Sequence, residues 1–119
     1  MLFRSVPLIV HWPSKARASY THWSSHLDIA PTLLHDLFGC SNEVSDYSVG
    51  QNLFTPTKRQ FLLMANYSKY GIVEENRITT FDPHGGLEVT DSKLEPLTNS
   101  NPSSEVISQA MEWQRRFLR

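Results

Sequence analysis

The sequence predicts an α/β fold, of which these 119 residues show the α+β part. Three observations support this class. The apolar run 6–10 does not alternate with polar residues, which is typical of a strand buried on both faces of a parallel sheet. A capped amphipathic helix is expected after it. Four short β-prone runs and a terminal amphipathic helix then indicate a small antiparallel sheet covered by a helix.

The first expected strand runs over 2–10 and ends at Trp12-Pro13, because proline cannot donate to a strand ladder. A strand buried on both faces needs parallel neighbours and covering helices, and the residues before it supply neither. We therefore expect the chain to be a C-terminal fragment of a larger domain. A polar loop follows through residue 25.

The next element is a helix expected over about 28–38. Asp28 is a natural N-cap, Pro31 lies in the first turn where its missing N–H does little harm, and Gly39 suits the left-handed position after the last turn. Its apolar residues form one stripe, as in an amphipathic helix: Ile29, Leu33, Leu34, Leu37 and Phe38.

Residues 40–59 are rich in Ser, Asn, Asp, Thr and Pro and predict an irregular connection, in which Val49, Leu53 and Phe54 are expected to pack against the core. The β-prone runs after it are spaced as a meander. They cover 60–67, 70–74, 77–81 and 87–90, with 93–97 as an optional extension. The turn 82–86 has two glycines able to take positive φ, so the runs beside it are expected to pair as a hairpin.

The terminal helix is expected to start either with Asn101 as cap and Pro102 at the first position, or with Ser103 as cap. Its apolar residues recur at intervals of three and four and are wide enough to cover a sheet face. These residues are Val106, Ile107, Ala110, Met111, Trp113, Phe117 and Leu118.

Composition limits the function classes. The formal net charge is −1 and 39% of the residues are apolar, so the chain is globular in composition and nucleic acid is not an expected partner. A single cysteine, Cys40, excludes an internal disulfide and a multi-cysteine zinc site. No apolar run approaches the ~20 residues that cross a bilayer.

Two motifs carry a resemblance to a known family. Val6-Pro7-Leu8-Ile9-Val10 with Trp12-Pro13, and Asp28 followed by Pro31-Thr32-Leu33-Leu34 and Gly39, resemble the end of a sulfatase-like domain of the alkaline phosphatase superfamily. One departure is Ser14, where many relatives have glycine. The more specific resemblance, which includes His26-Leu27-Asp28, the run 45–54 and the terminal helix, is to the C-terminal part of the periplasmic domain of the YejM (PbgA) family of inner-membrane proteins.

The resemblance implies a hydrolase of sulfate or phosphate esters that uses a divalent metal (Mg, Mn, Ca or Zn), or a descendant that binds or senses lipids such as cardiolipin and lipopolysaccharide. It implies the periplasmic side of the inner membrane. It also divides the chain into the end of a main α/β unit, 1–58, and an antiparallel β subunit with a closing helix, 59–119. In this family the nucleophile and metal ligands precede the apolar strand. No catalytic residue and no metal ligand is therefore expected here, and the rest of the parent domain is the expected partner.

The residues themselves offer weak candidates for chemistry. His22 and His26, with Asp28, have metal-ligand residue types, but Trp23 stands where a zinc-protease helix needs glutamate, so we expect these histidines to lie near a shared cleft without binding a metal. Ser5 lacks the arginine of a sulfatase nucleophile motif, and Cys40 has no basic neighbour to activate it.

One loop has the composition of a lipid contact. Lys15, Arg17 and Trp23, with Tyr20 and His22, combine cations with amphipathic rings that favour a membrane interface. Stable anchoring by charge usually takes about four or more cations, so a solvated loop is the simpler interpretation. Three hypotheses stay open: the scaffold of an ester hydrolase, a non-catalytic lipid-binding or partner-binding domain, and an independent α+β module.

Overall fold

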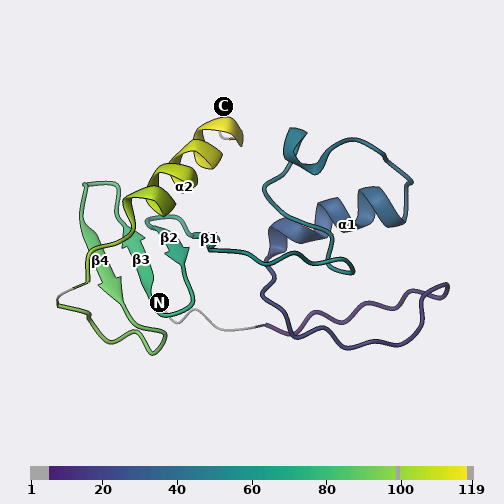
Figure 1. Ribbon diagram of the computed structural model, residues 1–119, viewed down its shortest axis with the longest axis horizontal. Coiled ribbons are helices and arrows are strands. Elements are labelled where there is room, and N and C mark those ends of the chain that lie inside the picture. The colour runs from purple at the N-terminus through teal and green to yellow at the C-terminus, as the bar shows by residue number, and fades with distance from the viewer. Residues whose placement is uncertain (1–5, 99, 118–119) are drawn as a thin grey trace.

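The computed structural model describes residues 6–98 and 100–117. It has an α+β architecture, as the sequence predicts: a four-stranded antiparallel sheet and two α-helices, with two single turns of 3-10 helix. The sheet and the terminal helix α2 lie at one end of the long axis, and α1 with its loops lies at the other (Figure 1).

The sheet is a meander in the order β1-β2-β3-β4. Its strands are β1 (Leu62–Ala65), β2 (Tyr70–Val73), β3 (Ile78–Phe81) and β4 (Leu87–Thr90), each inside one of the predicted runs. Gly85 takes a φ of +85° in the last turn, which confirms the predicted hairpin. The optional extension reduces to one isolated bridge between Thr90 and Pro96.

The core lies between this sheet and α2 (Ser104–Phe117). Ser103 is the cap, because its hydroxyl oxygen accepts the N–H of Val106 at 3.5 Å. The buried cluster comprises Phe61, Ile72, Val106 and Ala110, with Leu63, Phe81, Ile107 and Trp113 packed against it. The rings of Phe61 and Trp113 are 4.9 Å apart. The predicted covering of a sheet face is therefore confirmed, although Met111 is 60% exposed and Leu118 lies outside the described residues.

The predicted buried strand is wrong for this structure. Residues 6–10 form no strand, and Ile9 is 91% exposed. The physical reason is that a strand needs a neighbour for its backbone groups, and no described residue offers one to this segment. Residues 2–5 of the predicted strand, including Ser5, lie outside the described residues.

The helix predicted over 28–38 is present as a 3-10 turn η1 (His26–Asp28) followed by α1 (Ile29–Asp36). Gly39 has a φ of +67°, as its position predicts. The helix buries Pro31 and Thr32, whereas Leu37 and Phe38 of the apolar stripe are 57% and 68% exposed. The stripe is thus largely uncovered.

The connection after α1 contains one further 3-10 turn, η2 (Val44–Asp46). Of the three residues expected to pack against the core, Phe54 packs instead on the loop before α1. Its ring lies 5.6 Å from that of Trp12 and 5.7 Å from that of Tyr20. Val49 and Leu53 are half-buried.

Candidate functional site

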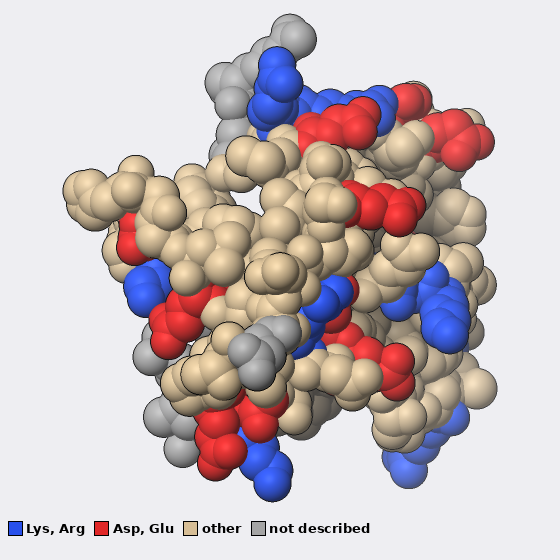
Figure 2. Space-filling view, turned by 60° about the vertical axis from the view of Figure 1, so that its left-hand side comes forward, with Lys and Arg blue, Asp and Glu red and all other residues tan. Residues whose placement is uncertain are grey.

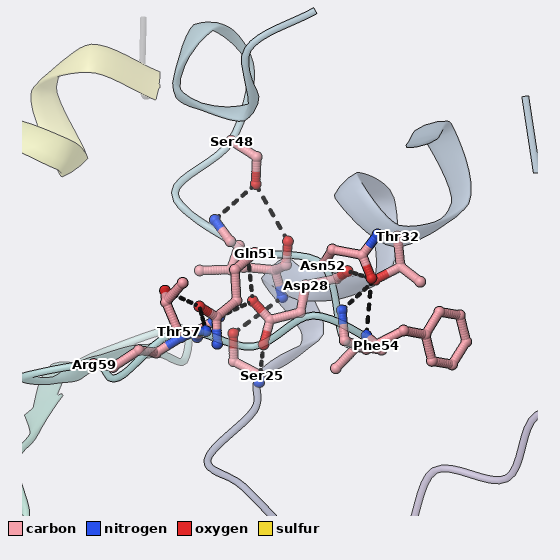
Figure 3. A network of polar contacts seen from close by, with 12 residues as sticks. Ser25, Asp28, Thr32, Ser48, Gln51, Asn52, Phe54, Thr57 and Arg59 are labelled. Atoms are coloured by element: carbon pink, nitrogen blue, oxygen red, sulfur yellow. Dashed lines mark hydrogen bonds and ion pairs between the residues drawn. The ribbon is translucent and has the colours of Figure 1, made fainter. Parts of the chain in front are cut away.

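A buried carboxylate organises the part of the molecule that contains α1 and the loops on either side of it, which we call the α1 half. The side chain of Asp28 is fully buried and accepts the backbone N–H of Ser25 at 2.7 Å and that of Gln51 at 2.9 Å. The guanidinium of Arg59 completes its coordination as an ion pair (Figure 3). A carboxylate without water needs such partners, because an unpaired buried charge is very costly.

The local sequence explains how Asp28 reaches this position. Ser25 caps η1 by accepting the N–H of Leu27 at 3.2 Å, and Asp28 accepts the N–H of Ser25 in return. The prediction that Asp28 caps the main helix is therefore corrected: its carboxylate binds no backbone N–H of α1. The capping box and the Arg59 pair use the carboxylate oxygens instead.

A second set of bonds holds the connection 48–54 against η1 and α1. The Thr32 hydroxyl donates to the Asp28 carbonyl at 2.6 Å and accepts the N–H of Leu53 at 2.8 Å. Ser48 donates to the carbonyl of Leu27 at 3.2 Å. Gly50 lies so close that an added Cβ would be 2.0 Å from the Leu27 oxygen. This network is suited to holding the backbone rather than to chemistry, since its acceptors are already occupied.

The two candidate histidines have different surroundings. The Tyr20 ring meets His22 edge to face with centroids 5.8 Å apart, and the Nε2 atom of His22 is buried without a partner among the described residues. His26 is exposed in η1. The described residues contain no group of three or more His, Cys, Asp or Glu side chains placed to hold a metal ion.

Lys15 makes internal contacts. Its ammonium lies 2.9 Å from the Asp36 carboxylate and 4.3 Å from the centroid of the Phe54 ring. Arg17 is exposed and has no ion pair within the described part of the chain, and Trp23 is 41% exposed. All three expected lipid-contact residues keep exposed surface: Arg17, Trp23 and Lys15, whose side chain is 37% exposed.

Asp36 is the centre of a second polar cluster. The His35 ring at 2.5 Å, the Lys15 ammonium and the Asn52 amide at 3.1 Å lower the pKa of its carboxyl from 3.8 to about 2. Hydrogen bonds from Nδ1 of His35 and from Lys15 stabilise the charged form. This cluster fastens the loop at 15 and the connection at 52 to the end of α1.

One cleft, of about 460 Å³, lies between the α1 half and the sheet. Ser25, Leu27 and the run 49–51 line one wall, residues 57–63 the other, and Gln109 and Trp113 of α2 complete it. His22 and His26 do not line it.

On the face shown in Figure 2, basic and acidic side chains are interspersed and do not form a single basic patch.

Sequence reasoning missed the residues that complete these clusters. Arg59, Gln51 and Thr32 lie up to 31 positions from their partners, and nothing in local spacing indicates such contacts. The one available signal was composition: Lys58 and Arg59 are the cations of a connection that is rich in small polar residues.

No protein-family model matches the chain. The inner membrane protein YejM of Salmonella typhimurium is 25% identical over 114 residues, which cover 95% of this chain and 20% of that protein. YejM of Salmonella typhi gives the same values. An uncharacterized protein of Haemophilus influenzae is 26% identical over 115 residues, again 95% of this chain and 20% of the relative.

The chain is therefore a distant relative of YejM, an inner-membrane protein, and it spans about a fifth of the length of the curated relatives it matches. Within the part of the chain that the structure describes, no helix is both long and apolar enough to span a bilayer.

Proposed function

We propose that this chain is the scaffold-forming C-terminal part of a sulfatase-like domain in a YejM-type inner-membrane protein, on the periplasmic side. In this proposal, residues 1–58 end the main α/β unit and residues 59–119 form an antiparallel β subunit closed by α2. Both the distant relationship to YejM and the motifs around Leu8 and Asp28 support this assignment.

The observation that carries the proposal is the apolar surface of the α1 half. Val6, Leu8 and Ile9 are 74%, 57% and 91% exposed, and Leu37 and Phe38, which directly follow α1, are also uncovered. Burying one such side chain stabilises a fold by about 1.5–3 kcal/mol. A parallel sheet supplied by the rest of the domain would bury residues 6–10 and give their backbone groups partners.

The chemistry of the parent is ester hydrolysis in this proposal, with sulfate or phosphate esters as the substrate class and a bound divalent metal as Lewis acid. In this proposal the metal ligands and the nucleophile come from the remainder of the domain, as the resemblance of the sequence motifs implies. The role of this chain is to hold the end of the sheet and helix α1 in place through the Asp28 network.

The scaffold role is tested with Leu8→Asp in the longer protein and in the 119-residue chain alone. In the longer protein we expect a loss of about 3 kcal/mol in the free energy of unfolding, because a charge enters a buried strand. In the chain alone we expect little change. The matched control is Leu87→Asp, since Leu87 is 50% exposed on the sheet. Equal, small effects of both variants in the longer protein would contradict the proposal.

The proposal that the active-site residues lie outside this chain is tested by assaying the isolated chain with aryl sulfates and aryl phosphates in the presence of Mg²⁺ or Mn²⁺. We expect no turnover. Metal-dependent turnover that disappears in His26→Ala would place the active site within these residues and reject this division of labour.

A second candidate function, binding of anionic lipid, is favoured by the exposed loop before α1. Arg17 is exposed and Trp23 and Tyr20 are 41% and 50% exposed, so a cation and two amphipathic rings are accessible together. Vesicles with and without cardiolipin test it. Binding that requires cardiolipin and falls in Arg17→Glu supports the candidate, whereas equal binding to both vesicles counts against it.

A further inference from the structure

The two edges of the sheet differ in how they are protected. At β4, the chain turns back after Asp91, the Leu97 N–H donates to the Val89 carbonyl at 2.9 Å, and Pro96 bridges to Thr90. Such a covering segment with proline prevents further strand pairing. At β1, no described residue pairs with the outer side of Leu62–Ala65, and the strand carries no charge or proline to discourage pairing.

The hairpin register shows which backbone groups of β1 are available. Asn66 donates its N–H to the carbonyl of Lys69, so these two residues form a hydrogen-bonded pair. Such pairs recur at every second position of an antiparallel hairpin, so the next ones are Met64–Gly71 and Leu62–Val73. The N–H and C=O of Leu63 therefore point away from β2. The same alternation places Val89 on the outer side of β4, where Leu97 binds it.

The cleft of about 460 Å³ runs beside this open edge. Phe61, Leu62 and Leu63 line it on the sheet side, and Val49-Gly50-Gln51 line the facing wall. Its size is in the range of sites that take small molecules and short peptides, about 300–1,000 Å³.

The charge of the cleft indicates the chemistry of its occupant. Lys58 and Arg59 line it, and no Asp or Glu does. Asp28 pairs with Arg59, whereas Lys58 is exposed and has no ion pair among the described residues. Uncompensated positive charge beside an open strand edge suits an extended segment that carries acidic side chains.

We propose that the outer edge of β1 binds an extended, acidic peptide segment of a separate polypeptide, which adds to the sheet as a fifth strand. The backbone of Leu63 pairs with the peptide, and Lys58 selects for acidic side chains. Strand addition of this kind takes affinity from main-chain hydrogen bonds and specificity from the side-chain surroundings.

The test is selection of random linear peptides on the immobilised longer protein that contains these 119 residues, followed by amide hydrogen exchange with a selected peptide bound. We expect the selected peptides to be enriched in Asp and Glu. The Leu63 amide should then exchange more slowly, whereas the Met64 amide, already paired with β2, should not change.

Lys58→Glu should weaken binding about fivefold, the effect of a rim charge worth about 1 kcal/mol. The matched control is Lys93→Glu, an exposed lysine in the turn that covers β4, and it should bind as the wild type does. Three outcomes would overturn the proposal: no peptide selected, selected peptides that leave the Leu63 amide unchanged, or equal losses in both variants. Protection of Leu63 that rises with protein concentration alone would instead identify a second copy as the occupant.

Discussion

Asp28 joins segments that are far apart in the chain. Its carboxylate binds the backbone at Ser25 and Gln51 and the guanidinium of Arg59, and its carbonyl accepts the Thr32 hydroxyl. A buried ion pair gives little net stability by itself, but breaking it leaves an unpaired charge in a dry site. The network therefore makes the α1 half depend on one acidic side chain.

Asp28→Asn should destabilise the chain by about 3 kcal/mol, because Arg59, whose side chain is 13% exposed, loses its counter-charge in a largely buried position. Urea denaturation followed by circular dichroism measures the change. Asp46→Asn is the control, since Asp46 is exposed in η2. A loss of stability no larger than that of the control would contradict the assigned role of the Asp28 carboxylate.

The Asp36 carboxylate makes the free energy of unfolding depend on pH in the acidic range. Since the pKa of its carboxyl is held at about 2 by His35, Lys15 and Asn52, against an ordinary 3.8, the folded state binds the proton less readily than the unfolded state. The stabilisation is present above about pH 4 and is lost as the pH falls through about 2. Solvent screening limits it to about 1 kcal/mol.

The expected result is that stability measured between pH 4 and pH 2 falls less steeply in Asp36→Asn than in the wild type. Asp82, whose pKa is lowered by the backbone N–H groups of Gly86 and His84, is common to both proteins and cancels in the difference. Parallel pH profiles would show that the Asp36 cluster does not stabilise the fold.

At the scale of elements, the close approach of the connection 48–54 to η1 requires a glycine. Gly50→Ala would place a methyl group against the Leu27 carbonyl, and overpacking of this kind costs about 2 kcal/mol. Gly39→Ala offers a comparison, because its site has open space and a φ of +67°, so only backbone strain of about 1 kcal/mol is expected. Thermal unfolding of both variants tests the ranking, and a milder effect at Gly50 would contradict the close contact.

The elements that local sequence predicts well are those stabilised by near neighbours. The hairpins of the sheet, the turn at Gly85 and the Ser103 cap need only residues a few positions away, and α2 shows its covering face in its spacing. Distant contacts were not predictable. Asp28 was interpreted as a cap because its carboxylate partners Gln51 and Arg59 lie more than twenty positions away.

The predicted strand at 6–10 failed for a related reason. Its apolar pattern predicts that the segment is buried. Burial needs neighbouring strands and helices, and the described residues supply none to this segment. The same holds for the stripe of α1, which is amphipathic yet largely uncovered. The ion pair of Lys15 was not predictable either, because its partner Asp36 lies twenty-one positions away.

At the scale of the whole molecule, the apolar surface is unevenly distributed. The sheet and α2 share one buried cluster, whereas the α1 half leaves Ile9, Leu37 and Phe38 uncovered. The curated relatives are about five times as long as this chain, since it covers 20% of their length. We therefore expect additional polypeptide to complete the exposed half.

Amide hydrogen exchange at Leu8, Ile9 and Val10 tests this claim most directly, measured in the 119-residue chain and in the longer protein that contains it. We expect fast exchange in the chain alone, where these residues are exposed, and strong protection in the longer protein, where they pair as a buried strand. Fast exchange in both proteins would contradict it.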